Sequence, residues 1–166
     1  MKNSNMPNIM IRKATKKDVP IILSFIKELA EYERLSKSVT ATKKILGKNL
    51  FGRRKVAETL IAYLDGKPAG FAAFFHNFST FLGKPGIYLE DLFVKPKYRG
   101  KGVGKRLLVE VARIAKKRDC GRLVWSVLNW NSPAIDFYKK LGAKPLDEWT
   151  MYRVTGATLD RLAEKK

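Results

Sequence analysis

Three alternating glycines stand among several cations between Arg99 and Arg106, where a loop leads into a helical pattern. Glycine lets the backbone turn tightly and approach a ligand closely. The first N–H groups of a helix have no intrahelical acceptor and carry a partial positive charge. Such a junction can bind a pyrophosphate, although the glycines could also serve helix packing and the lysines solubility. The spacing matches neither a dinucleotide-binding fingerprint nor a P-loop.

The charge of the chain also favours an anionic ligand. The 166 residues carry a formal net charge of +19, and Glu110 is the only acidic residue between Lys95 and Arg118. This balance suits a phosphorylated cofactor, nucleic acid or an acidic membrane surface. A nucleic-acid-binding module is therefore the alternative of another class. It is the less favoured one, because aromatic residues are not interleaved with the basic cluster as a base-stacking surface needs.

Few residues are available for nucleophilic, disulfide or metal chemistry. Cys120 and His76 are the only cysteine and histidine. A lone cysteine forms no intramolecular disulfide, and a His/Cys metal site lacks ligands, so we expect no metal. Residues 1–8 lack the apolar core of a signal peptide, and the longest apolar run, 70–75, is too short to span a bilayer. We expect a cytoplasmic protein that does not enter the membrane.

The elements that would position these residues alternate between strand and helix patterns. A capping box at Thr15–Asp18 precedes apolar residues at helical spacing, and Asp65-Gly66 is typical of a hairpin turn. Ser132-Pro133 is a favourable helix start, with serine as the N-cap and proline at the first position. The predicted strands are 9–12, 60–64, 69–78, 87–94, 123–128 and 149–154; the predicted helices are 19–32, 40–50, 104–120, 133–142 and a short one at the C-terminus.

This pattern predicts one domain over residues 1–166, of the α/β (α+β) class, in the order βααβββαβαβ. A mixed central β-sheet would be flanked by helices. The order places the glycine-rich stretch at the end of a strand and the start of a helix, as an anion site requires.

Two segments of this arrangement resemble a known family. Tyr98-Arg-Gly-Lys-Gly-Val-Gly104, after a strand ending in Phe93-Val94, resembles the acetyl-CoA signature of the GNAT N-acetyltransferases. The stretch from Asn131 to Gly142 resembles the second segment of that family, and the element order agrees. Tyr88–Val94 and Lys27–Glu33 are similar to the diamine acetyltransferases, which acetylate spermidine, spermine or thialysine.

The resemblance implies a site for acetyl-CoA that draws on three stretches of the chain. Backbone groups near Val94 would bind the pantetheine arm, the glycine-rich loop would wrap the pyrophosphate, and the helix after Asn131 would flank the other side. The implied cofactor-binding residues are Leu92, Phe93, Val94, Arg99, Gly100, Lys101, Gly102, Val103, Gly104, Lys105, Asn131, Ser132, Pro133 and Ala134.

The resemblance also implies the catalytic groups. Glu90 would accept the proton that the ammonium of the acceptor must lose, and Tyr138 would protonate the leaving thiolate. Tyr32 and Glu33 would line the acceptor pocket with Glu90. Glu90 and Asp91 are neighbours on a predicted strand, so regular alternation would let only one of them face the cleft. A local acidic pocket formed by Glu28, Glu31, Glu33, Glu90 and Asp91 would attract a cationic acceptor.

The expected function is transfer of an acetyl group from acetyl-CoA to a primary amine of a small cationic acceptor, such as a polyamine or thialysine. The amine would attack directly in a ternary complex, without a metal. A GNAT enzyme acting on a protein or peptide amine is the nearest alternative. The resemblance further implies a homodimer.

Overall fold

The computed structural model describes residues 8–165, so the expectation about a signal peptide in residues 1–8 lies almost wholly outside it. Contacts divide the chain into two compact units, residues 1–126 and 127–166. The first unit contains β1 (Ile9–Lys13), α1 (Val19–Tyr32), α2 (Lys43–Phe51), β2 (Glu58–Leu64), β3 (Lys67–Ser79), β4 (Lys84–Val94), α3 (Val103–Lys117) and β5 (Leu123–Trp125). The second contains α4 (Ser132–Lys140) and α5 (Ala157–Ala163).

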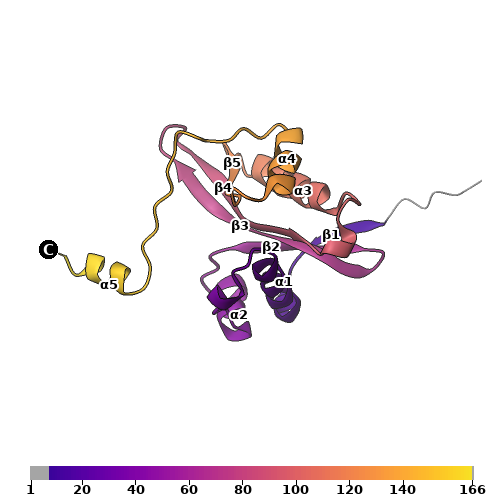
Figure 1. Cartoon of the computed structure of the whole chain (residues 1–166), viewed down its shortest axis with the longest axis horizontal. Coiled ribbons are helices and arrows are strands. Elements are labelled where there is room, and N and C mark those ends of the chain that lie inside the picture. The colour runs from indigo at the N-terminus through magenta and orange to yellow at the C-terminus, as the bar shows by residue number, and fades with distance from the viewer. Residues whose placement is uncertain (1–7, 166) are drawn as a thin grey trace, which may run out of the picture. The chain divides into compact units, whose positions relative to one another are not determined.

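The first unit is built on one five-stranded sheet in the order β1-β2-β3-β4-β5. Strands β1 to β4 are antiparallel neighbours, and β5 runs parallel to β4. Helices α1 and α2 cover one face of the sheet and α3 covers the other (Figure 1). The predicted fold class, a mixed sheet flanked by helices, is confirmed.

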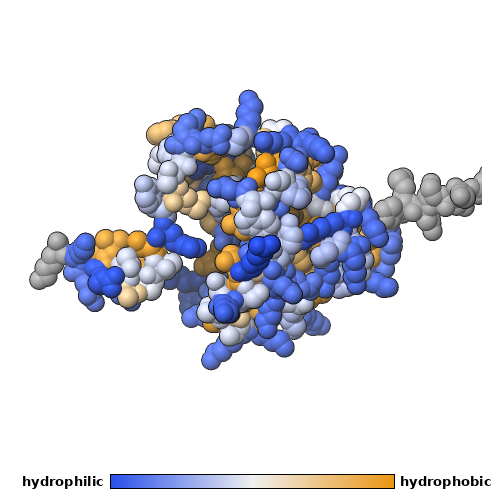
Figure 2. Space-filling view, in the orientation of Figure 1, coloured by the Kyte–Doolittle hydropathy of each residue, from blue (hydrophilic) through white to orange (hydrophobic). Residues whose placement is uncertain are grey.

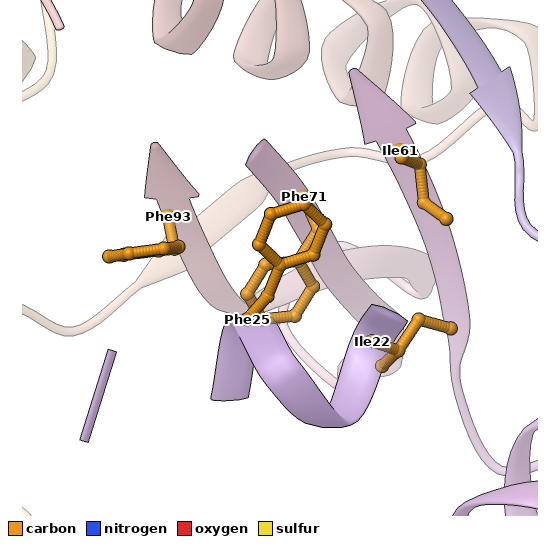
Figure 3. Packing of buried hydrophobic residues seen from close by; sticks show 5 residues of the cluster. All are labelled: Ile22, Phe25, Ile61, Phe71 and Phe93. Carbon is orange, nitrogen blue, oxygen red and sulfur yellow. The ribbon is translucent and has the colours of Figure 1, made fainter. Parts of the chain in front are cut away.

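The core under α1 is aromatic. The rings of Phe25 and Phe71 stack with centroids 5.4 Å apart, and Phe93 lies tilted 6.2 Å from Phe25 (Figure 3). Ile22 and Ile61 complete this cluster, and all five side chains are almost fully buried. Because Ile61, Phe71 and Phe93 are register partners on β2, β3 and β4, they form one row on the face of the sheet under α1 and α2. This row fixes which other side chains of the three strands share that face.

Local signals in the sequence set most of the element ends. Thr15 and Asp18 form the predicted capping box, which closes a short 3-10 turn before α1. Asp65 and Gly66 make the predicted hairpin turn, both with positive φ. Helix α2 begins after Thr42, whose hydroxyl accepts a hydrogen bond from the Ile45 N–H.

Two predicted details differ from the structure. The N-cap of α4 is Asn131 rather than Ser132, because the asparagine side chain accepts the N–H of Ala134. Residues 149–154 form no strand, although their composition favours one, and α5 follows them. Trp149, Met151 and Tyr152 are strongly exposed there. A strand exists only when it pairs with another, and composition alone does not supply the partner.

No helix within residues 8–165 is both long enough and apolar enough to cross a membrane.

Candidate active site

The glycine-rich loop has the geometry that an anion site needs. Gly100 and Gly102 have φ values of +73° and +85°, which only glycine adopts without strain. Gly102 is the N-cap of α3 and offers no side chain to the first turn, so the N–H groups of Val103, Gly104 and Lys105 face no capping oxygen. Lys101 and Lys105 are exposed beside them. These residues fit the pyrophosphate of a phosphorylated cofactor.

Two cations of the same stretch turn toward α1 instead. Lys95 donates to the carboxylate of Glu28 at 2.7 Å, which neutralises one acid of the predicted pocket. The guanidinium of Arg99 lies over the ring of Tyr32, 4.3 Å from its centroid, and its Nε donates to the Val94 carbonyl at 3.0 Å. Arg99 therefore joins the loop to the end of α1.

Strand β4 loses its β5 neighbour halfway along. The parallel pairing runs from Ile87 to Leu89 only. Within the described part of the chain, residues 91–94 therefore pair with β3 on one side and with no strand on the other. Phe93 is buried in the aromatic core, and only its backbone remains for a ligand. The free edge at Leu92 and Val94 is where an extended amide chain, such as a pantetheine arm, can pair like a strand.

A β-bulge interrupts β4 at Glu90. Ala73 is the register partner of Asp91, but its neighbour Phe74 is the partner of Leu89, so Glu90 is the extra residue. Asp91 and Phe93 point to the face of the sheet under α1. Because of the bulge, Leu89 points to the opposite face, toward α3. The simple alternation expected for Glu90 and Asp91 does not apply at this point. Glu90 is exposed, and Asp91 is half-buried.

Asp91 has the most perturbed acidity among the carboxyl groups of this region. Burial, together with the nearby charges of Glu90 and Glu33, raises its pKa to about 7. Burial also raises the pKa of Glu33. A carboxyl group with a pKa near 7 exchanges a proton readily at neutral pH, as a general base must. The structure thus brings together Glu33, Glu90 and Asp91 of the predicted pocket.

Sequence reasoning gave the catalytic role to Glu90 and did not single out Asp91. Two adjacent acidic residues inside an apolar strand were the signal in the sequence that one of them has a special environment. Which of them is buried depends on the bulge, which no residue pattern in the strand indicated.

The remaining predicted residues belong to the second unit. Asn131 is buried, caps α4 through its side chain, and precedes Ser132, Pro133 and Ala134 in the first turn of that helix. Tyr138 lies in the last turn of α4, half-buried, with its ring centroid 5.2 Å from that of Phe137. The predicted site residues are therefore divided between the two units, with Asn131 and Tyr138 in the second.

Metal ligands are not gathered anywhere in the described part of the chain. Residues 8–165 contain no group of three or more His, Cys, Asp or Glu that could hold a metal ion. Cys120 is half-buried, and the exposed His76 lies on β3.

Comparison with known proteins shows where this arrangement recurs. Residues 24–143 match the acetyltransferase (GNAT) family. The bovine (Bos taurus) thialysine N-epsilon-acetyltransferase is 38% identical over 96% of this chain and 100% of its own length. An L-ornithine N5-acetyltransferase of Arabidopsis thaliana is 33% identical over 92% of this chain and 86% of its own. A solved integron cassette protein of V. cholerae, 30% identical, superposes with a TM-score of 0.79 over 95% of this chain and 98% of its own.

Proposed function

Because this chain belongs to the GNAT acetyltransferase family, we propose that it transfers an acetyl group from acetyl-CoA to a primary amine of a small acceptor. The observation that supports this most is Asp91, a carboxyl group with a pKa of about 7 beside the free edge of β4 and on the same sheet face as the acidic end of α1. An amine acetyltransferase needs a group that accepts a proton from the acceptor near neutral pH, whereas a protein that only binds a ligand does not.

Asp91 acts on the acceptor first. The amine arrives as an ammonium ion, and its nitrogen has no lone pair until it gives up a proton. Ionised Asp91 accepts this proton, directly or through a water molecule. Glu90 and Glu33 keep the pKa of Asp91 high and attract the cationic acceptor, which is the role that remains for Glu90 at its exposed position.

The transfer then proceeds in one step within a ternary complex. Acetyl-CoA, when bound, supplies the acetyl group. The amine nitrogen forms the new C–N bond, the C–S bond breaks, and the sulfur keeps the bonding electrons as a thiolate. The nitrogen then loses its second proton, which replaces the proton that Tyr138 gives to the thiolate. A backbone N–H at the free edge near Leu92 stabilises the negative charge that develops on the carbonyl oxygen. Tyr138 donates its phenolic proton to the thiolate, a role that comes from the family resemblance.

The glycine-rich loop holds the other end of the cofactor. The N–H groups at the start of α3 and the side chains of Lys101 and Lys105 bind the pyrophosphate. Arg99 keeps the loop against α1 through Tyr32, so cofactor and acceptor meet at one fixed place. This division suits the charge of the chain, with the basic region at the cofactor and the acids at the acceptor amine.

We also propose that the chain works as a homodimer in the cytoplasm. Exposed hydrophobic side chains lie along α5 in Figure 2, where Leu159 and Leu162 are about half exposed. Trp149 and Tyr152 in the preceding segment are 72% and 90% exposed. Side chains of this kind are commonly covered by a second subunit. Multi-angle light scattering gives the mass of the particle, and the mass of one chain would contradict the dimer.

The test of the activity is release of the CoA thiol from acetyl-CoA with a panel of amines. The panel contains thialysine, lysine, ornithine, putrescine, spermidine, spermine and a lysine-rich peptide. We expect turnover with at least one small amine, and a loss of about a hundredfold or more in Asp91→Asn and in Tyr138→Phe. Turnover with the peptide alone would indicate that the acceptor is a protein or peptide amine and not a small molecule. Failure to bind acetyl-CoA at all would overturn the proposal.

A further inference from the structure

A cavity of about 310 Å³ opens at the end of the sheet where β2 begins. Its walls come from the end of β1, the end of α2, the loop after α2, the start of β2 and the second half of β3. Since a water molecule occupies roughly 30 Å³, the cavity has room for a molecule of about ten non-hydrogen atoms. Neither the carboxyl groups assigned to the acceptor nor the glycine-rich loop lines it, so acetyl transfer makes no use of this space.

Much of the cavity wall is apolar. Leu50 and Phe51 at the end of α2 pack against the aromatic core and also line the cavity, and Val56 in the following loop is 62% exposed. Phe75 lines the cavity from β3, and its ring stacks on that of Tyr88 with the centroids 5.3 Å apart, which fixes its position. The apolar body of a ligand would cover these side chains and remove them from water.

Thr59 gives the cavity wall a polar group that the chain itself does not use. This residue is only 5% exposed, and its hydroxyl has no hydrogen-bond partner among the described residues. Thr59 and Ile61 are two residues apart on β2, so both point to the face of the sheet that α1 and α2 cover. A buried hydroxyl without a partner lowers the stability of the fold. A ligand atom that accepts a hydrogen bond from it would remove this penalty.

The charges around the cavity favour an anion. Glu58 is the only acidic residue among those that line it, and it is already paired: Arg118 donates two hydrogen bonds to it, one of 2.8 Å, and Lys13 lies 3.8 Å away. Lys55 also lines the cavity, is exposed, and forms no ion pair within the described residues. Residues 34–57, which include α2 and this loop, contain eight lysines and arginines and no acidic residue. Such a region attracts anions and repels cations.

We propose that this cavity binds a small organic anion with an apolar body, such as an aromatic or aliphatic monocarboxylate. The carboxylate accepts a hydrogen bond from the hydroxyl of Thr59 and pairs with the ammonium of Lys55, while the body covers Phe51, Val56 and Phe75. A compact anion such as phosphate would leave these apolar walls in water. The site holds neither acetyl-CoA nor the acceptor amine, so it goes beyond the proposed function and does not depend on it.

Calorimetric titration tests the chemistry of the ligand, with neither acetyl-CoA nor an amine present. The compounds are phenylacetate, the neutral phenylacetamide of nearly the same shape, and inorganic phosphate. We expect phenylacetate to bind at least about fivefold more tightly than either of the other two, because only it combines a charge with an apolar body. Equal affinity for the amide or for phosphate would overturn the proposal. So would the absence of phenylacetate binding up to about 10 mM.

Charge-reversal variants test where the carboxylate binds. Lys55→Glu should weaken phenylacetate binding about fivefold or more, whereas Lys67→Glu, the same change at the exposed β2–β3 turn, should leave it unchanged. Equal affinity in these two variants would overturn the proposal. Lys101→Glu examines the glycine-rich loop as the other basic site, and a loss of binding there in place of Lys55→Glu would also overturn it.

Thr59→Val tests the hydroxyl, because valine keeps the branched shape and removes the unpaired polar group. Without ligand, we expect the Tm of this variant to rise by about 2 °C or more. The same variant should bind phenylacetate several-fold more weakly, because the hydrogen bond to the carboxylate is lost. Weaker binding by a more stable protein supports the contact, since damage to the fold would lower both. Unchanged affinity for phenylacetate would overturn the contact with Thr59.

Discussion

Replacement of Asp91 by asparagine should make the protein more stable at pH 8 and nearly inactive. Asparagine has the shape of a protonated aspartate and carries no charge. In the wild type, burial raises the pKa of Asp91 from 3.8 to about 7. Between these values the folded state holds a proton that the unfolded state has released, so the stability of the fold decreases as the pH rises from about 4 to about 7.

The size of the effect follows from the pKa difference. A shift from 3.8 to about 7 corresponds to roughly 4 kcal/mol of stability lost by the wild type above pH 7. Relaxation around the charge reduces this value, so it is an upper estimate. For a chain of this length, each kcal/mol moves Tm by roughly 2–4 °C. We expect Asp91→Asn to raise Tm by at least about 5 °C at pH 8 and to change it little at pH 4.

The assay is thermal unfolding by circular dichroism at pH 4 and pH 8, together with kcat/KM for a small amine from pH 5.5 to 9. The wild-type kcat/KM should increase with pH and level off above about 7, as Asp91 ionises. Glu33→Gln should move this midpoint to lower pH, because one source of repulsion is removed.

Asp119→Asn is the control for the stability measurement, because its carboxylate is 84% exposed and pairs only with Lys84. It should change Tm little at either pH. A destabilising role of the Asp91 charge is excluded if Asp91→Asn is less stable than the wild type at pH 8, or if its effect on Tm is equal at both pH values.

Three other changes test the surroundings of the site. Gly102→Ala forces alanine to a φ of +85°, which costs roughly 1–3 kcal/mol, and should raise KM for acetyl-CoA several-fold; an unchanged KM would contradict the role of the loop. Arg99→Lys keeps the charge but loses the planar stack on Tyr32 and should weaken acetyl-CoA binding measured by calorimetry, whereas equal affinity would contradict this contact. Asp18→Asn breaks the paired hydrogen bonds from Arg12, which hold the pKa of Asp18 below its usual range. This change should lower Tm at pH 7 by several degrees and have a smaller effect near pH 3. A carboxyl group with a depressed pKa stabilises the fold above its pKa in the unfolded chain, and this stabilisation is lost as the pH falls. Equal effects on Tm at both pH values would argue against the Arg12–Asp18 pair.

Much of the fold could be predicted because short-range signals determine it. The capping box at Thr15, the Asp65-Gly66 turn and the helical spacing from Leu107 to Ala115 each depend on neighbouring residues, and the structure contains all three. The strand expected at 149–154 was wrong, because a strand depends on a partner that its own residues do not specify.

The candidate site was predictable only in part for a similar reason. The glycine-rich loop could be found from spacing alone, because positive φ values and a helix start are local requirements. Asp91 could not be chosen over Glu90, because its burial follows from an extra residue in β4 relative to β3.

The most direct test of the acetyl-transfer account is to identify the product by mass spectrometry. The enzyme is incubated with acetyl-CoA and thialysine, with Asp91→Asn and Asp119→Asn in parallel. We expect the wild type and Asp119→Asn to acetylate thialysine on its side-chain nitrogen, and Asp91→Asn to form almost no product. Product formed equally fast by Asp91→Asn, or an enzyme that binds acetyl-CoA and acetylates no amine of the panel, would contradict it.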